Sequence, residues 1–271
     1  MDLWTLFIGF LLGIIEGVTE FLPVSSTGHL ILAGDLLWFT DDRAKTFEIA
    51  IQLGAILAVL WLYRGRIGEN VSGLSRSRAA RGFWLNLGIA FVPAAAVGFL
   101  AHKWIKLYLF NPVTVAAALV AGGIAILVIE RLGRPETTAE VENVTPGQAL
   151  KIGAAQCLAL FPGVSRAGAT IMGGLVFGLS RKAATEFSFF LAIPTMFAAV
   201  GYDLFKNRGT LSASDLPLFA VGFATAFVSA LFVIKAFIGF VSRRDFTPFA
   251  VYRIVFGLLV LAYYGMKGWA F

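Results

Sequence analysis

The sequence has little charge for its length. Only 14% of the 271 residues are charged, against roughly 25% in soluble domains, whereas 58% are hydrophobic and the mean hydropathy is +0.82. A chain with so few charges cannot cover itself with a polar surface. The composition excludes an ordinary soluble domain and predicts a polytopic membrane protein, whose core is buried against lipid and neighbouring helices.

Cysteine is almost absent. Cys157 is the only one, which excludes an internal disulfide and a multi-cysteine metal site. The formal net charge of +6 comes from basic residues that cluster in loops and not along one exposed helix. Such loops are typical of an anionic membrane surface and do not indicate nucleic-acid binding.

The polar residues that are present concentrate in residues 13–29, GIIEGVTEFLPVSSTGH. Glu16 and Glu20 are four apart and would share one helix face, and Pro23 would end that helix. Three glycines lie close to that face and would let another backbone approach: Gly9, Gly13 and Gly17. Ionisable groups at membrane depth face a cavity or a partner, so this cluster is a candidate functional site. The alternative is a buried polar cluster that only fixes helix packing.

Two short apolar segments, residues 3–22 and 29–39, flank a break rich in proline, serine and glycine. Neither is a comfortable full span, which needs about 20 apolar residues. They predict a re-entrant hairpin, because irregular backbone at that depth must be surrounded by protein or a water-filled cavity. Longer apolar runs predict transmembrane helices at 47–63, 83–101, 112–129, 184–204, 216–240 and 248–266.

The second half of the chain repeats the first at a constant offset. The offset that matches Gly13 with Gly153 also matches Val24-Ser25 with Val164-Ser165 and Gly82-Phe83 with Gly222-Phe223. A second broken hairpin is therefore expected at 149–179. Each half then has one hairpin and three spans, and an odd number of crossings inverts the second half.

The predicted fold is an all-α polytopic membrane protein with an inverted-topology repeat, each half a re-entrant helix hairpin plus three transmembrane helices. Residues 1–271 form a single integral membrane domain. Repeat 1 covers about 1–131, a polar linker 132–147 and repeat 2 about 148–271.

The basic residues predict the orientation of this fold. If the loop 64–81 is cytoplasmic, twelve basic residues lie on that side: Arg64, Arg66, Arg76, Arg78, Arg81, Arg131, Arg134, Lys151, Arg181, Lys182, Arg243 and Arg244. Seven lie outside: Arg43, Lys45, Lys103, Lys106, Lys206, Arg208 and Lys267. This asymmetry satisfies the positive-inside rule. Both termini would then be outside, with the first hairpin opening outward and the second inward.

The repeat also matches Ser26 with Arg166 and Glu16 with Gln156. Both hairpin tips should meet near the midplane of the membrane. There, a hydroxyl, a carboxylate pair and the imidazole of His29 would face a guanidinium. An arginine fork suits phosphate oxygens, and glycine-bearing turns beside helix starts can add backbone N–H donors for an anion.

Two motifs carry a resemblance to a known family. EGVTEFLPVSSTGH (16–29) and PGVSRAGAT (162–170) resemble the signatures of undecaprenyl-diphosphate phosphatase, the bacitracin-resistance protein family of bacterial inner membranes. AKTFEIAIQLGAILAV (44–59) is also similar, and the likeness covers essentially the whole chain. One residue departs from the pattern: Ala167 stands where the family usually has serine.

The resemblance implies hydrolysis of undecaprenyl diphosphate to undecaprenyl phosphate and inorganic phosphate, aided by Mg²⁺ or Ca²⁺. This recycles the lipid carrier for peptidoglycan synthesis and confers bacitracin resistance. It places the protein in the bacterial inner membrane, with an active site that opens to the periplasmic side. The partners are a polyprenyl diphosphate lipid and membrane lipid, with no nucleic acid; a homodimer is left open.

These residues fit phosphoryl transfer, which needs positioning and charge stabilisation above all. Our hypothesis makes Ser26 the nucleophile, with His29 as its base or as acid for the leaving group. Arg166 would hold the phosphoryl oxygens, and Glu16 and Glu20 would bind the divalent cation. Further phosphate-binding groups would be Ser25, Thr27, Ser165, Thr170, Gly163 and Gly168.

Several alternatives stay open at this point. Ser25 and Ser26 could cap the helix that begins near His29, and Ser25 or an activated water could replace Ser26 as nucleophile. Arg253, deep in a predicted span, is expected to form a structural ion pair. Glu48 and Gln52 share one helix face and would line the cavity or tie helices together.

Two other classes of function compete with a phosphatase. Broken hairpins in an inverted repeat also build transporters, so a carrier or flippase of a phosphorylated polyprenyl lipid is the second hypothesis. A transporter needs an anion site but no nucleophile beside a base. A purely structural scaffold would leave the polar cluster unexplained.

Overall fold

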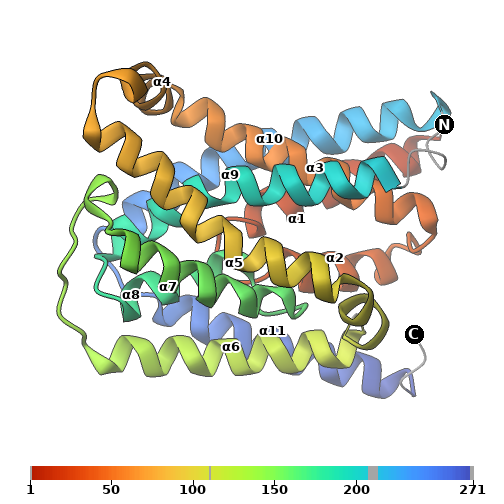
Figure 1. Ribbon diagram of the computed structural model, residues 1–271. Coiled ribbons are helices and arrows are strands. Elements are labelled where there is room, and N and C mark those ends of the chain that lie inside the picture. The colour runs from red at the N-terminus through yellow and green to blue at the C-terminus, as the bar shows by residue number, and fades with distance from the viewer. Residues whose placement is uncertain (1, 110, 207–212, 269–271) are drawn as a thin grey trace.

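The computed structural model describes residues 2–109, 111–206 and 213–268, which form a bundle of helices (Figure 1). The α-helices are α1 (Leu3–Thr19), α2 (Ser26–Leu36), α3 (Asp42–Leu62), α4 (Arg64–Ser72), α5 (Arg78–Tyr108), α6 (Pro112–Leu132), α7 (Pro146–Gln156), α8 (Arg166–Val176), α9 (Arg181–Lys206), α10 (Leu216–Val241) and α11 (Thr247–Met266). Four short 3₁₀ helices join them: η1 (Gly73–Ser75), η2 (Val141–Asn143), η3 (Cys157–Leu160) and η4 (Ala213–Asp215). Within the described ranges, β-pairing is confined to one isolated bridge between Thr138 and Leu179. The predicted all-α class is confirmed.

Five of the described helices are long and apolar enough to cross a membrane: α5, α6, α9, α10 and α11. A sixth span is available if the bent pair 46–62 and 64–75, whose parts meet at 69°, counts as one. The chain is therefore a multi-pass membrane protein, with helices at each of the six predicted runs. The chief difference is α5, which continues through Pro93 and past the predicted end as a single helix.

Two pairs of shorter helices are interrupted where the sequence predicts hairpin tips. One break separates α1 from α2, and the other separates η3 from α8. Each break ends in a serine with a positive φ, 70° at Ser25 and 75° at Ser165. L-residues rarely adopt this conformation, and it costs of order 1–3 kcal/mol unless the surroundings enforce it. The same unusual conformation thus recurs at positions that the sequence repeat matches.

A stripe of glycines lets α1 pack closely against α10. A Cβ at Gly13 would collide with the carbonyl of Gly222, and one at Gly17 with the carbonyl of Ala226. The predicted close backbone approach is confirmed, and α10 is the partner. The matching helices of the other pair, α7 and α5, also pack together, with Gly153 against the backbone of Ala90.

The last helices of the two halves, α6 and α11, lie side by side along one face of the bundle (Figure 1). Gly123 lies against Ala250, and Gly257 against Ala116, so the two helices are antiparallel. This is the relation that an inverted repeat requires. The direction of each half across a membrane and the domain limits stay predictions.

The two ends of the bundle hold different segments. α4 and the connection from α6 to α7 lie at one end, and the first turn of α1 and the last turn of α11 lie at the other (Figure 1). Residues 133–145 of this connection dock on the turn before α9, where the N–H of Thr137 donates to the carbonyl of Gly178. Of the basic residues used to predict orientation, Arg208 lies outside the described residues.

Aromatic packing fixes the first hairpin tip in the core. Phe21 is fully buried and meets the ring of Phe189 on α9 edge to face, with centroids 5.4 Å apart. Phe190, the next residue of α9, packs in the same way on Phe83 of α5. The tip and the two long helices around it therefore share one apolar core.

Candidate active site

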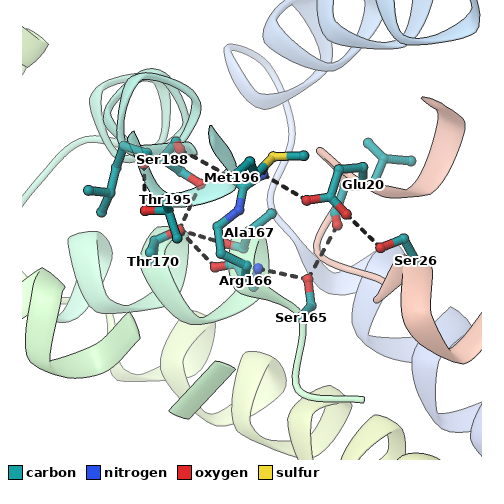
Figure 2. A network of polar contacts seen from close by, with 12 residues as sticks. Glu20, Ser26, Ser165, Arg166, Ala167, Thr170, Ser188, Thr195 and Met196 are labelled. Atoms are coloured by element: carbon teal, nitrogen blue, oxygen red, sulfur yellow. Dashed lines mark hydrogen bonds and ion pairs between the residues drawn. The ribbon is translucent and has the colours of Figure 1, made fainter. Parts of the chain in front are cut away.

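The two hairpin tips meet at one carboxylate. Glu20, at the end of α1, accepts a hydrogen bond from the Ser26 hydroxyl at 2.5 Å and another from Nη2 of Arg166 at 2.9 Å (Figure 2). The side chains of Glu20 and Arg166 are only 11% and 12% exposed. Because little water screens this ion pair, it is stronger than a surface pair. The predicted meeting of Ser26 and Arg166 is confirmed, with Glu20 between them.

Helix α9 and the first tip hold Arg166 in place. Its Nη1 donates to the carbonyl of Ser188 at 3.0 Å, and its Nη2 lies 3.4 Å from the sulfur of Met196. The ring of Phe21 lies under the guanidinium, 5.6 Å away. Nε of Arg166 is buried and has no hydrogen-bond partner among the described residues. The guanidinium is therefore fixed, with its Nε–H group left unpaired.

The side chains of the two serines with positive φ differ in their hydrogen bonds. The Ser165 hydroxyl accepts a hydrogen bond from the N–H of Gly168 at 3.0 Å and so caps α8. Ser25 precedes α2 in the same way, but its side chain makes no capping hydrogen bond. The capping alternative for Ser25 is therefore wrong in this structure.

The predicted phosphate-binding groups divide into two sets. Ser25, Thr27, Gly163 and Ser165 line a cavity together with Ser26. The other two, Thr170 and Gly168, lie behind Arg166 and do not line that cavity. The hydroxyl of Thr170 is buried 2.7 Å from the hydroxyl of Ser188, and the N–H of Gly168 is used in the cap of α8. In this structure the polar groups of both residues are thus used within the protein, and phosphate contacts from them stay a prediction.

His29 does not reach Ser26 in the structure. Its Nδ1 lies 2.7 Å from the carbonyl oxygen of Ser25, and its Nε2 lies 2.7 Å from the Tyr252 hydroxyl. The ring also stacks on Phe256, with centroids 4.1 Å apart. A neutral imidazole protonated at Nδ1 satisfies both hydrogen bonds at once. In the structure, the group hydrogen-bonded to the Ser26 hydroxyl is the Glu20 carboxylate, and the part of His29 in the reaction stays a prediction.

Glu16 is completely buried, and neither of its carboxylate oxygens has a hydrogen-bond partner in the described part of the chain. It interacts electrostatically with Glu20, Glu48 and Arg166. A buried carboxylate without a partner is costly, so two unused oxygens beside a second carboxylate fit a cation. The described residues include no group of three or more acidic, histidine or cysteine side chains that could hold a metal. A cation here would need water or phosphate oxygens as further ligands, as Mg²⁺ commonly does.

A cavity of about 570 Å³ opens at these side chains, within the usual size range of a small-molecule site. Its polar end is lined by Glu20, Ser25, Ser26, Thr27, Gln52, Gln156, Gly163, Ser165, Arg166 and Thr195. Its apolar wall comes mainly from α5, η3 and α9 and includes Phe91, Ala94, Phe99, Leu160, Met196 and Ala199. The sequence left open whether Glu48 and Gln52 line the cavity; Gln52 does and Glu48 does not. The cavity therefore combines polar side chains, Arg166 among them, with an apolar wall.

Arg253 of α11 ties the two tips together from the opposite side. It is 1% exposed, and among the described residues its guanidinium donates to backbone carbonyls and to no carboxylate. The acceptors are Pro23 of the first tip, Gly163 and Val164 of the second, and Ala118 and Leu119 of α6, at 2.9–3.3 Å. The predicted structural ion pair is wrong, because the partners of this buried cation are peptide carbonyls.

Sequence reasoning missed the α9 residues Ser188, Thr195 and Met196 as parts of the site. They lie within an apolar run that carries no motif, so only the packing of α9 against the tips identifies them. For Gln156 the sequence held one indication of a place in the site, because the repeat matches it with Glu16.

Comparison with known proteins gives a consistent result. A family model described as "Bacitracin resistance protein BacA" matches residues 9–259. A protein of Nitrosomonas eutropha named "Undecaprenyl-diphosphatase" is 59% identical over 275 residues, covering 100% of this chain and 99% of that protein. Proteins of the same name from Nitrosomonas europaea and Methylococcus capsulatus are 58% and 57% identical, over 100% and 96% of this chain and 99% and 96% of their own lengths.

Proposed function

Because the chain belongs to the bacitracin resistance protein BacA family, we propose that it is an undecaprenyl-diphosphatase. It hydrolyses undecaprenyl diphosphate to undecaprenyl phosphate and inorganic phosphate, and so recycles the lipid carrier for peptidoglycan synthesis. Relatives that carry this name are more than half identical to it over their whole length. The observation that carries the proposal is the Glu20 carboxylate, which lies between a hydroxyl and a guanidinium at the polar end of the cavity.

The geometry assigns the first half of the reaction to Ser26 and Glu20. The Ser26 oxygen attacks the terminal phosphorus, and Glu20, 2.5 Å away, accepts the hydroxyl proton. A bond forms between this phosphorus and the serine oxygen, and the bond to the bridging oxygen breaks. Undecaprenyl phosphate leaves with the bridging oxygen. Arg166 donates to the terminal phosphoryl oxygens and offsets the charge that develops there.

Water completes the turnover. It attacks the phosphorus of the phosphoserine, the serine oxygen leaves, and the proton held by Glu20 returns to it. The second proton of the attacking water passes to the medium, and inorganic phosphate is released. Ser25, Thr27, Gly163 and Ser165 line the cavity where these oxygens would lie.

Glu16 and Glu20 would hold the divalent cation. A bound Mg²⁺ or Ca²⁺ supplies charge neutralisation to the diphosphate oxygens and orients them. The two unpartnered oxygens of Glu16 support this assignment.

The apolar wall of the cavity suits the isoprenoid tail. Phe91 and Phe99 of α5 lie on this wall, and Phe99 is largely exposed on the outer surface of the bundle. A tail that follows α5 would pass from the polar end of the cavity to lipid without crossing a charged group of that helix. We place the protein in the bacterial inner membrane, as the family resemblance implies. The site would open to the periplasmic side, the side to which the basic residues predict that the first hairpin opens.

A carrier or flippase of the same lipid is not favoured. The relatives are named as diphosphatases. In addition, transport requires an anion site but does not require a hydroxyl hydrogen-bonded to a carboxylate beside it.

Phosphate release from a short-chain prenyl diphosphate by the protein purified in detergent tests this function. We expect Ser26→Ala and Arg166→Ala to fold and to lose activity by at least about a hundredfold. Ser72→Ala, an exposed serine of α4, should keep wild-type activity. Near-normal turnover of Ser26→Ala would exclude this nucleophile and point to Ser25 or to an activated water.

A further inference from the structure

Gln156 is a buried amide with an unused donor. It ends α7, is 2% exposed and lines the same cavity as Ser26 and Arg166. Its Nε2 is buried and has no hydrogen-bond partner in the described residues. Leaving a buried donor unpaired destabilises the fold, and such groups in native structures need an explanation.

The other end of the amide is held in place. The Thr195 hydroxyl shares its one proton between two acceptors, the carbonyl of Leu191 at 2.8 Å and, more weakly, Oε1 of Gln156 at 3.4 Å. Thr195 lines the cavity as well. With its oxygen next to Thr195, the amide has only its NH₂ group left for a ligand in the cavity. A ligand at this point must offer an acceptor oxygen.

The repeat adds an independent argument about charge. The offset that matches Ser26 with Arg166 matches Glu16 with Gln156, and both side chains are buried with unpartnered polar atoms. Glu16 presents only acceptors, which suit a cation. Gln156 presents a donor, which suits an anion. The two halves therefore carry complementary buried groups at matching positions, of which Gln156 lines the cavity and Glu16 does not.

We propose that Gln156 is a substrate-binding residue whose Nε2 donates to an oxygen of the diphosphate held by Arg166, with Thr195 as the residue that positions its amide. The proposal deepens the proposed function and rests on it. Because an amide is neutral, this contact would bind a phosphate oxygen without adding a second positive charge next to Arg166.

Two variants test the donor. Gln156→Leu removes the amide at similar volume, and Gln156→Glu replaces the donor with an acceptor of the same shape. With a short-chain prenyl diphosphate, we expect KM to rise about 10- to 100-fold in Gln156→Leu and further in Gln156→Glu, with a smaller change in kcat. Gln148→Glu makes the same chemical change on the same helix outside the cavity and should leave KM unchanged.

A binding measurement separates this proposal from the function on which it rests. In a Ser26→Ala background, equilibrium dialysis gives Kd for the same diphosphate, and we expect Gln156→Leu to raise it about as much as KM. Thermal unfolding shows whether each variant is folded; should Gln156→Leu unfold, Gln156→Glu supplies the comparison. Unchanged KM and Kd in a folded variant would overturn the role of Gln156 and mean that its amide serves only water. Absence of phosphate release by the wild-type protein would instead overturn the function, and Kd would still decide on Gln156.

Discussion

At the scale of single residues, the structure changes the mechanistic hypothesis mainly at one point, the identity of the base that accepts the proton of Ser26. The motif placed a histidine three residues after Ser26 and a glutamate six residues before it, and either could accept its proton. The intervening turn brings the glutamate to the hydroxyl, whereas the imidazole points to the carbonyl of Ser25 and to Tyr252. This geometry suggests the hypothesis that His29 is a brace, a side chain that holds the backbone of a serine with a positive φ in place.

The pH dependence of turnover distinguishes the two bases. His29→Phe keeps the aromatic stack on Phe256 and removes the hydrogen bond to Ser25. If His29 is a brace, activity should fall by only about tenfold, which corresponds to the free energy of one or two lost hydrogen bonds. The shape of the kcat–pH profile should then persist. If His29 is the base, activity should fall by about 10² to 10⁴. The acid limb of the kcat–pH profile that reports the base should then disappear.

At the scale of helices and hairpins, Arg253 determines how the tips are held. Its donors reach the carbonyls of Pro23 and Gly163 from opposite tips, so one side chain sets the separation between Ser26 and Arg166 without touching either. Peptide carbonyls near the midplane have no water to replace a lost donor.

We therefore expect Arg253→Met, which keeps length and loses every donor, to destabilise the fold by at least about 3 kcal/mol. Activity should be lost as well, since the tips would no longer be aligned. The measurement is thermal unfolding in detergent beside phosphate release. Lys235→Met, an exposed cation of α10, is the matched control and should change neither. An unfolding temperature of Arg253→Met equal to that of wild type would contradict the clamp.

The glycine stripe of α1 gives a second prediction at this scale. An added methyl group at Gly17 would collide with the backbone of α10 at Ala226, and overpacking of this kind costs about 1–3 kcal/mol. Gly17→Ala should therefore lower the unfolding temperature. Gly88→Ala in α5 has open space around it and should be neutral or slightly stabilising, because alanine favours helix. Equal stability of the two variants would mean that α1 and α10 can separate without cost.

At the scale of the whole molecule, the sequence was informative wherever a pattern is local or repeated. Apolar runs predicted the long helices, and Pro23 and the serine motifs predicted the breaks. The matching of Ser26 with Arg166 predicted that the tips meet. Arg253 was misjudged because its partners are carbonyls, which every residue has. Ser188 and Thr195 were missed because only the packing of α9 brings Ser188 to Arg166 and Thr195 to the cavity.

The arrangement of the helices also supports a single orientation. α4 and the loop after α6 share one end of the bundle, and the start of α1 and the end of α11 share the other (Figure 1). These are the segments that the basic residues assign to the cytoplasmic and the outer side. The orientation can be tested with cysteine labelling, because Cys157 is the only native cysteine and Cys157→Ser gives a background without thiols.

Two exposed positions without charge serve as reporters, Thr40 before α3 and Ser75 after α4. Neither substitution removes a basic residue, so the positive-inside balance that should set the orientation is unchanged. In intact cells, we expect a membrane-impermeant maleimide to label Thr40→Cys and not Ser75→Cys. After permeabilisation, both should react, which controls for accessibility. Labelling of Ser75→Cys but not of Thr40→Cys in intact cells would reverse the orientation, and the first hairpin would then open to the cytoplasm.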